Sequence, residues 1–376
     1  MAALPTRPRV AVICQVMAHY RESVHVELDK NDDIDFVFAS DPDGSHYALK
    51  TMSPRVLREH IVLKNRYWGR ATWQSGVLRM VLSKRYDAYI FTGDVSVLST
   101  WLGATIARLR KKPVLFWTIG WHRPERGAKS LARLTFYRLA SRLMVYGNTA
   151  KRLGASAGYP ADRISVIYNS IGQTALTATG AAASHPVANV GAIARLKGAK
   201  RFDLLLRAVS DLNRAGTPVR VTLGGEGPEH DVLHDLAEEL GVDLTLTGAV
   251  YGVDDTKNFY DSLDVTVIPT YAGLSIIQSL SHGVPVITDD DIYGQGPEWE
   301  AVTKKTGRIF EHDDLASLTG ALAVVLEAVE TDRSAFVAAC VAEVQERWTA
   351  PSQAGRILEA IRKESARENA KTRGTR

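Results

Sequence analysis

Short apolar runs recur along the first half of the chain, and each gives way to a polar loop. These runs begin at Arg9, Ile34, Ala88, Pro113 and Leu143, and we expect helices in the segments between them. A continuous apolar run of about four to eight residues is typical of a strand that is buried on both faces of a parallel sheet. Alternation of such strands with helices predicts a doubly wound α/β domain.

The same alternation returns in the second half. Strands are predicted at 187–196, 219–223, 244–250, 265–269 and 284–288, with helices between them. Because 376 residues are too many for one comfortable core, we expect two such domains. The first strand of the chain is not followed by Gly-x-Gly-x-x-Gly, which argues against a dinucleotide-binding oxidoreductase.

The segment 265–288 organises the rest of the chain. A strand ends at Pro269, Gly273 precedes a helix-like stretch from Ser275 to His282, and Gly283 closes that helix before the next strand. The helix N-terminus faces the carboxyl ends of the strands, so its free amides form a ready anion site. An ordinary crossover without a ligand is the alternative.

Residues 269–286 resemble the donor-site signature of retaining family 4 glycosyltransferases, which have the GT-B fold. The Gly-Leu pair at 273–274, the Gly-x-Pro-Val segment at 283–286 and their spacing match the family pattern. Neither glutamate of that pattern is present, because Thr270 and Gln278 occupy the two positions. The resemblance therefore implies the frame of the site with altered chemistry.

The resemblance implies roles for these positions in binding a nucleoside diphosphate sugar. The backbone amides of Gly273, Leu274 and Ser275 would bind the diphosphate as helix-end donors. Gln278 would contact ribose hydroxyls through neutral hydrogen bonds. Thr270 would lie at the donor sugar without the negative charge that a carboxylate supplies there, so retention of anomeric configuration is an expectation from the family only.

Two cations are implied to hold the diphosphate. Arg195 and Lys200, followed by Asp203, resemble the family's Gly-Arg-Leu and Lys-x-x-Asp elements. A diphosphate leaving group gains negative charge as the glycosidic bond breaks, and two nearby cations would stabilise it without a metal. Solvated loop cations are the alternative. Gly225, in a Gly-x-Gly-Pro turn, and Glu298, which resembles a later family glutamate, complete the expected donor set.

The first domain is implied to bind the acceptor. His19 and Arg21 lie in the loop after the first strand, which faces the cleft in the resemblance, and a solvated loop is the alternative. Family members often place a histidine after the strand at 113–120, where it reaches the donor sugar. Ile119 fills that position here, so His122 is the candidate for a catalytic role, with an ordinary surface histidine as the alternative.

Charge is divided unevenly along the chain. The net charge is +4, yet residues 187–345 hold 12 Lys and Arg against 25 Asp and Glu, which leaves 34 and 17 for the remainder. A basic part of this kind predicts an anionic partner, and no nucleic-acid-binding motif is present. Two distant cysteines, Cys14 and Cys340, and the absence of a long apolar run or signal peptide fit a cytoplasmic protein.

The segment 50–85 is strongly basic. It holds nine Lys and Arg with a single acid, Glu59, and interleaves aromatic residues among them. Aromatic and basic residues at helical spacing suit a surface that lies in a lipid headgroup layer. The alternative is a solvated amphipathic helix whose aromatic face packs on the core.

The expected organisation is a GT-B enzyme of two Rossmann-like domains that face a central cleft. The acceptor-binding domain spans 1–172, a flexible linker 173–186, and the nucleotide-sugar-binding domain 187–346. A C-terminal helix at 347–366 would pack back on the first domain, and 367–376 would form a disordered tail.

The expected activity is transfer of a hexose-type sugar from a nucleoside diphosphate sugar to a lipid-linked or polysaccharide precursor at the cytoplasmic membrane face. No cofactor or metal is expected, because there is no Asp-x-Asp triplet and the run 289–291 is more typical of a solvated loop. Three alternatives remain: a soluble natural-product acceptor, a non-catalytic glycosyltransferase-like subunit, and a sugar-nucleotide epimerase of the same architecture. The base, the sugar, the acceptor and the linkage are left open.

Overall fold

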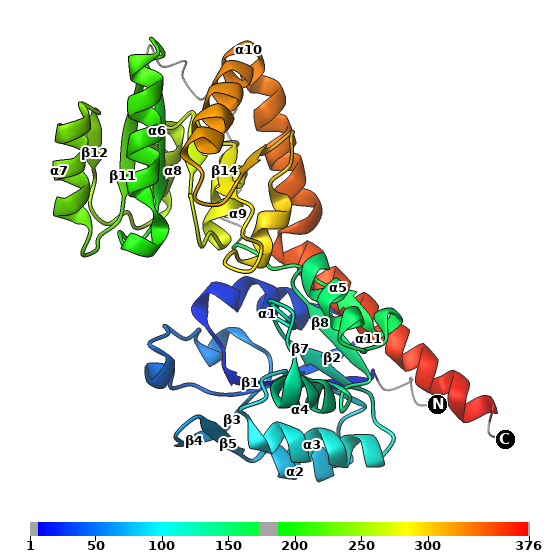
Figure 1. Cartoon of the computed structure of the whole chain (residues 1–376). Coiled ribbons are helices and arrows are strands. Elements are labelled where there is room, and N and C mark those ends of the chain that lie inside the picture. Colours follow the sequence, from blue (N-terminus) through cyan, green and yellow to red (C-terminus); the bar gives the residue numbers. More distant parts are fainter. Residues whose placement is uncertain (1–6, 173–186, 375–376) are drawn as a thin grey trace. The chain divides into compact units, whose positions relative to one another are not determined.

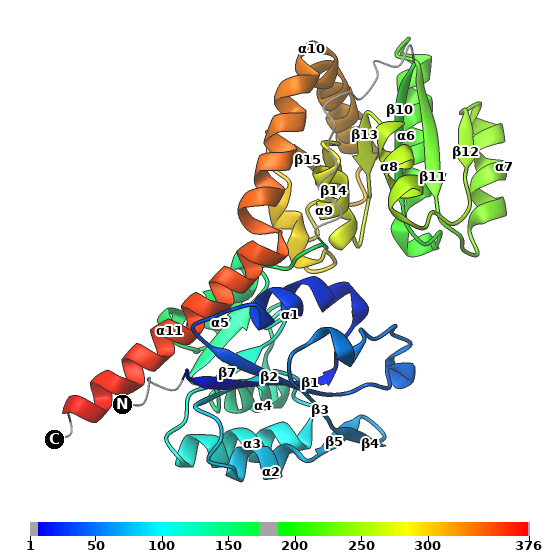
Figure 2. The same cartoon turned by 180° about the vertical axis from the view of Figure 1, so that it is seen from behind.

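The computed structural model describes residues 7–172 and 187–374 and divides the chain into two compact units (Figures 1 and 2). Unit 1 comprises residues 1–172 and 350–376, and unit 2 comprises residues 173–349. The predicted linker at 173–186 lies outside the described residues.

Unit 1 is built on a seven-stranded sheet with the order β3-β2-β1-β6-β7-β8-β9, in which all neighbouring strands are parallel. The strands are β1 (Arg9–Val16), β2 (Asp35–Asp41), β3 (His60–Val62), β6 (Ala88–Thr92), β7 (Val114–Trp117), β8 (Arg142–Val145) and β9 (Ile164–Val166). The chain moves outward from β1 in one direction and then returns to start again at β6. The winding direction therefore reverses between β1 and β6.

Two hydrophobic cores cover the two faces of this sheet. Alternate residues of β1 point to opposite faces, as in any strand, so that Val12 belongs to one core and Ile13 to the other. The first core contains residues of α1 (Glu22–Asp29) and α11 (Ala350–Gly374). The second contains residues of α2 (Val77–Leu82), α3 (Leu98–Leu109), α4 (Gly127–Tyr137) and α5 (Asn148–Ser156). The short 3-10 helices are η1 (His19–Arg21), η2 (Ser45–Tyr47), η3 (Pro54–Val56) and η4 (Ala161–Arg163).

The C-terminal helix α11 is an integral layer of unit 1. Its buried Ile357 and Ile361 join the core on the α1 face. Gln353 donates to the carbonyl of Tyr168 at 2.6 Å and accepts from the hydroxyl of Ser170 at 2.7 Å. The helix runs to Gly374, so the tail predicted at 367–376 was placed too early.

The basic segment 50–85 does not form the expected helical face. It contains β3, the antiparallel hairpin β4 (Lys64–Trp68) with β5 (Ala71–Ser75), and only the short helix α2. Exposed and less exposed residues alternate along β4, which is the period of a strand and not of a helix. Gly69, at a φ of +57°, starts the two-residue turn that closes the hairpin.

Unit 2 repeats the same winding on a six-stranded parallel sheet with the order β12-β11-β10-β13-β14-β15. The strands are β10 (Ala188–Ile193), β11 (Val219–Gly224), β12 (Leu244–Leu246), β13 (Val265–Val267), β14 (Val286–Asp289) and β15 (Gly307–Phe310). The helices are η6 (Gly198–Lys200), α6 (Phe202–Arg214), α7 (His230–Leu240), α8 (Val253–Asp261), α9 (Leu274–Ser281), η7 (Pro297–Ala301) and α10 (Leu315–Arg347). In sequence order this is the 3-2-1-4-5-6 arrangement of nucleotide-binding folds.

Helix α10 closes unit 2. It contacts both α6 and α9, and it bends at Asp332, whose backbone is not helical. Just after the bend Arg333 forms an ion pair with the buried Asp264. Both units thus confirm the predicted doubly wound α/β architecture. Within the described residues, no helix combines the length and apolar character needed to cross a membrane.

Candidate functional site: the carboxyl edge of unit 2

The winding direction of unit 2 reverses between β10 and β13. In open α/β sheets, ligands bind outside the carboxyl ends of the strands at such a switch point. The loop after β10 carries Arg195 and Lys200, and the loop after β13 carries Thr270 and leads to Gly273. Four of the predicted donor residues therefore lie on the two loops that flank the switch point.

Lys200 joins these two loops. It ends η6, and its Nζ donates to the carbonyl of Tyr271 at 2.6 Å. Tyr271 holds a left-handed backbone with a φ of +52°, an uncommon conformation for a non-glycine residue that often marks a functional site. Burial lowers the pKa of Lys200. Arg195 is exposed, and no described residue hydrogen-bonds or ion-pairs with its guanidinium. Of the two cations on this edge, only Lys200 has a partner among the described residues, and that partner is a neutral carbonyl.

Helix α9 begins at this edge with unpaired amide groups. The first backbone amide with a bond of its own is that of Ile276, which donates to the carbonyl of Gly273 at 2.9 Å. The amides of Gly273, Leu274 and Ser275 have no acceptor among the described residues. They are the donors that a helix N-terminus offers to an anion. Gln278 lies one turn further along, half-buried, and its side-chain amide has no partner among those residues.

Thr270 does not leave its hydroxyl free for a ligand. Its side chain is 4% exposed, and Oγ1 donates to the carbonyl of Ala199. That bond ties the loop after β13 to η6, just before Lys200. The position that a glutamate fills in the family pattern is thus used here to hold two loops together.

Gly225 and Glu298 occupy crowded positions at the same edge. Gly225 follows β11 with a φ of +127°, and a Cβ there would lie 2.0 Å from the carbonyl oxygen of Ala194. Only glycine permits this approach of two backbones. Glu298, in η7, is 3% exposed, and its Oε2 lies 2.5 Å from where a Cβ of Gly296 would be. The structure thus brings Glu298 next to the loop that ends at Gly273, because the Gly296 amide donates to the carbonyl of Ala272 at 2.7 Å.

A second polar network, which we did not predict, supports this loop from behind. The amide of Ala272 donates to Gln295 Oε1 at 2.7 Å, and Gln295 Nε2 donates to Thr288 Oγ1 at 2.8 Å and to the carboxylate of Asp289. The same carboxylate bonds the ring of His312. This hydrogen bond raises the pKa of His312. A chain of contacts therefore links the surface histidine to the backbone just before α9.

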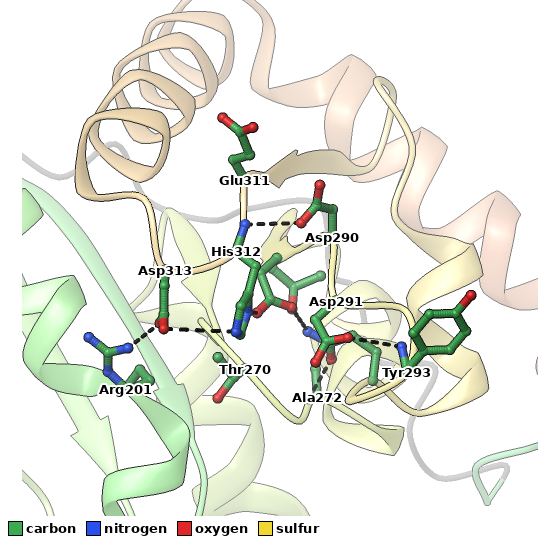
Figure 3. Close-up of polar contacts among 12 residues, drawn as sticks. Arg201, Thr270, Ala272, Asp290, Asp291, Tyr293, Glu311, His312 and Asp313 are labelled. Carbon is green, nitrogen blue, oxygen red and sulfur yellow. Dashed lines mark hydrogen bonds and ion pairs between the residues drawn. The ribbon is translucent and has the colours of Figure 1, made fainter. Parts of the chain in front are cut away.

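The predicted solvated run 289–291 is wrong for its first member. Asp289 is fully buried as the last residue of β14, whereas Asp290 is exposed and accepts from the amide of His312 at 2.9 Å (Figure 3). Position in the central part of the sheet buries Asp289, and the donors of Gln295 and His312 compensate its charge. Among the described residues, no group of three or more His, Cys, Asp or Glu side chains is arranged to hold a metal ion.

The predicted acceptor residues lie at the switch point of unit 1. His19 and Arg21 belong to η1, directly after β1. His19 is exposed and pairs with Glu22 at 3.3 Å. Arg21 turns inward, and the centre of its guanidinium lies 5.5 Å from the ring of Tyr20, 5.7 Å from Trp117 and 5.4 Å from Tyr146.

His122 follows β7 on unit 1 and is exposed. Its pKa lies below the ordinary value, first because of desolvation and then because of Arg133, while Glu125 acts in the opposite direction. The neighbouring Trp121 is buried against Tyr137. The three proposed catalytic residues are thus divided between the units, with His122 on unit 1 and the two cations on unit 2.

The chain is similar to known proteins both in sequence and in fold. Residues 187–328 match the family described as glycosyl transferases group 1. This stretch covers β10 to β15 and most of the site described above. All of the matched residues lie in unit 2.

One curated relative is the lipopolysaccharide core biosynthesis glycosyltransferase LpsE of Rhizobium meliloti, which is 35% identical over 103 residues. The match spans 27% of this chain and only 28% of that relative.

The fold of the whole chain is that of known GT-B glycosyltransferases. The lipopolysaccharide outer core galactosyltransferase WaaB superposes with a TM-score of 0.71 and 15% identity, over 95% of this chain and 99% of that one. HepE of Anabaena, solved in complex with UDP, superposes with a TM-score of 0.68 and 16% identity, over 94% and 100%. At these identities the likeness establishes the fold, and the GT-B prediction is confirmed.

Proposed function

We propose that this protein is a metal-independent glycosyltransferase that uses a nucleoside diphosphate sugar. The observation that carries the proposal is the placement of Lys200 beside the unpaired amides of Gly273, Leu274 and Ser275 at the switch point of unit 2. This arrangement offers one cation and several fixed dipoles to one anion. The structure of the HepE fold neighbour with UDP supports the choice of a nucleotide.

Arg195 and Lys200 supply the positive charge that the reaction needs. As the glycosidic bond breaks, the diphosphate gains negative charge, and cations that already lie in place stabilise it without reorganisation. In the structure, Lys200 Nζ donates its hydrogen bond to the Tyr271 carbonyl. We expect that bond to be retained or exchanged for a phosphate oxygen when the donor binds.

The donor sugar is the part of the substrate that the altered residues would recognise. Thr270 contributes no negative charge. Glu298, whose side chain is buried at 3% exposure beside Gly296, would instead stabilise the positive charge that develops on a hexose-type sugar. Gln278 would bind the ribose, and His122 of unit 1 is retained as the candidate catalytic histidine. Retention of anomeric configuration is part of this proposal.

The acceptor is proposed to be a lipid-linked or saccharide precursor at the inner face of the cell membrane. The LpsE and WaaB relatives bear names from lipopolysaccharide synthesis. The β4–β5 hairpin supports a membrane contact, because Trp68 at its end is 59% exposed between the exposed Arg66 and Arg70.

Vesicle flotation tests the membrane contact. The protein should float with vesicles that contain anionic lipids at low salt, and a Trp68→Ala, Arg70→Gln double variant should float less. Binding that high salt does not weaken would contradict the electrostatic part of this proposal.

Thermal melting in buffer with a chelator tests the donor site. One nucleoside diphosphate of a panel should raise the melting temperature by mass action. Lys200→Ala should weaken its affinity by about 1.5–3 kcal/mol, the worth of a hydrogen bond to a charged group. Lys197→Ala, which removes an exposed charge three residues away on the same loop, is the control and should retain the shift. No shift with any nucleotide would overturn the proposal.

A non-catalytic donor-binding subunit is the second candidate, because the Thr270 hydroxyl is already bonded within the chain. Release of nucleoside diphosphate from the matching nucleotide sugar distinguishes the two. Turnover that Arg195→Ala abolishes indicates the enzyme, and binding without any turnover indicates the subunit.

A further inference from the structure

Arg21 occupies the switch point of unit 1, where the winding direction reverses between β1 and β6. It is the last residue of η1 and occupies the N-cap position of α1, without a side-chain capping bond. Ligands of doubly wound sheets bind at this position, outside the carboxyl ends of the strands. The place of Arg21 in the fold is therefore that of a ligand-binding residue, quite apart from its chemistry.

Three aromatic rings surround its guanidinium. Tyr20 precedes it in the chain, Trp117 ends β7 and Tyr146 follows β8, and each ring centre lies between 5.4 and 5.7 Å from the guanidinium carbon. Trp117 and Tyr146 are buried, whereas Tyr20 is 46% exposed. Aromatic faces at this distance attract a cation and keep it charged while leaving its N–H groups as donors.

The charge of Arg21 is not compensated by an acid. Among the residues that the structure describes, no carboxylate forms an ion pair with it, and Glu22, the nearest in sequence, pairs with His19 instead. The side-chain Nε of Arg21 is buried and has no hydrogen-bond partner within residues 7–172 and 187–374. Burial and the nearby Arg21 lower the pKa of His25 to about 3, so that this ring is neutral.

Arg21 itself remains charged. Its pKa is raised overall: burial, the largest effect, lowers it, but Tyr146, Tyr20 and Cys14 more than offset that effect. Burying part of a cation that has no acidic partner costs free energy, unless a bound anion compensates the charge. The fork of a guanidinium matches the oxygens of a phosphate or a carboxylate.

We propose that the ring-enclosed guanidinium of Arg21 binds an anionic group, a phosphate or a carboxylate, of the acceptor saccharide. The exposed face of Tyr20 would lie against the sugar ring that bears this group. The inference rests on the proposed function, since it names the class of acceptor for that reaction. The inference predicts that the acceptor is an acidic or phosphorylated saccharide and not a neutral one.

Calorimetric titration with glucose 1-phosphate, glucuronate and methyl glucoside tests this assignment. Each titration is run with and without saturating nucleoside diphosphate, so that binding to the anion site of unit 2 is recognised and subtracted. We expect binding of the phosphate or the carboxylate sugar and none of the neutral sugar, and the better of the first two identifies the anion.

Arg21→Gln should weaken that binding by about tenfold or more. Arg21→Lys keeps the charge but not the fork, so its affinity should lie between those of the wild type and Arg21→Gln. Arg152→Gln is the matched control, because Arg152 is an exposed arginine of unit 1 whose only hydrogen-bond partner among the described residues is Thr149, at 3.2 Å. This variant should bind as the wild type does. Equal affinity in Arg21→Gln, or equal binding of methyl glucoside, would overturn the inference.

The nucleoside diphosphate titration separates this inference from the proposed function. If Arg21→Gln still binds the nucleotide, unit 2 is intact and the loss belongs to the acceptor site. If Arg21→Gln does not fold, Arg21→Lys carries the test, and unchanged affinity in it for both anionic sugars would overturn recognition by the guanidinium fork. If the wild type binds anionic sugars but no nucleotide, the proposed function fails while the anion site stands.

Discussion

Lys200 is the residue on which the chemistry of unit 2 depends most. Its position could be predicted because the motif around it is local, from Arg195 to Asp203. Its environment could not be predicted, since the carbonyl that it contacts belongs to Tyr271, 71 residues later. The bond from Thr270 to Ala199 could not be predicted for the same reason, because these residues are also 71 positions apart.

The lowered pKa of Lys200 predicts a pH dependence of nucleotide binding. The anion binds the charged ammonium, so affinity is complete well below this pKa and declines as the pH rises through it. Because burial lowers the pKa, the decline should begin at a lower pH than for an ordinary lysine, whose pKa is about 10.4. Calorimetry from neutral to alkaline pH measures it. Lys200→Arg, which stays charged, should bind the nucleotide with the same affinity across this pH range. An equally flat profile for the wild type would contradict the prediction.

His312 predicts a second pH effect, on stability. The hydrogen bond to Asp289 raises its pKa above 6.5, so the folded state favours the charged ring. This contribution is fully present below the unfolded pKa and is lost as the pH rises through the folded one. Melting of the wild type should therefore show a loss of stability in this window that His312→Asn lacks. The same dependence in both proteins would refute the role of the ring.

Asp289 shows where local reasoning stops. In the sequence it is one of three consecutive aspartates, a pattern that usually indicates a solvated loop. Its partners, Gln295 and His312, lie 6 and 23 residues later, and only the pairing of β14 between β13 and β15 brings them together. A buried acid whose donors come from later loops leaves no local signal.

At the scale of elements, buried strands were the easiest to predict. Short apolar runs such as those of β1 and β13 suit strands that are buried on both faces in the middle of a parallel sheet. The β4–β5 hairpin was missed because its charged residues masked a period of two, although Gly69 in the turn was a usable signal. The extent of α11 was also underestimated, since its last turns are polar and carry no apolar period.

The contact between α11 and the sheet of unit 1 predicts a large stability effect. Glu364 on α11 is 0% exposed and lies 3.6 Å from Arg142 of β8, which is also buried. Glu364→Ala would leave that arginine uncompensated, at a cost of about 3–5 kcal/mol. Chemical denaturation measures it.

Glu359 on the same helix provides the control. It is an exposed residue that pairs only with Lys363 in the described contacts, at 2.6 Å. Glu359→Ala should change the free energy of unfolding by about 0.5 kcal/mol or less. Similar losses in both variants would contradict the role of the buried pair.

At the scale of the whole molecule, two units with the same winding order carry opposite charge. Residues 187–345 hold 25 acids against 12 basic residues, yet the switch point of unit 2 presents Arg195 and Lys200. The cations of the candidate site thus belong to a unit with net negative charge, which favours binding of an anion at a specific site over general attraction. The fold class followed from the sequence because periodicity reports topology, whereas the substrate depends on contacts between distant loops.

Hydrogen exchange of the amides at 273–275 tests the central claim, that a nucleoside diphosphate binds the start of α9 beside Lys200. These amides have no acceptor among the described residues, so they should exchange fast in the free protein and become protected when the nucleotide binds. Lys200→Ala should lose most of this protection and Lys197→Ala should keep it. Protection elsewhere in unit 2 with no change at 273–275 would contradict the account.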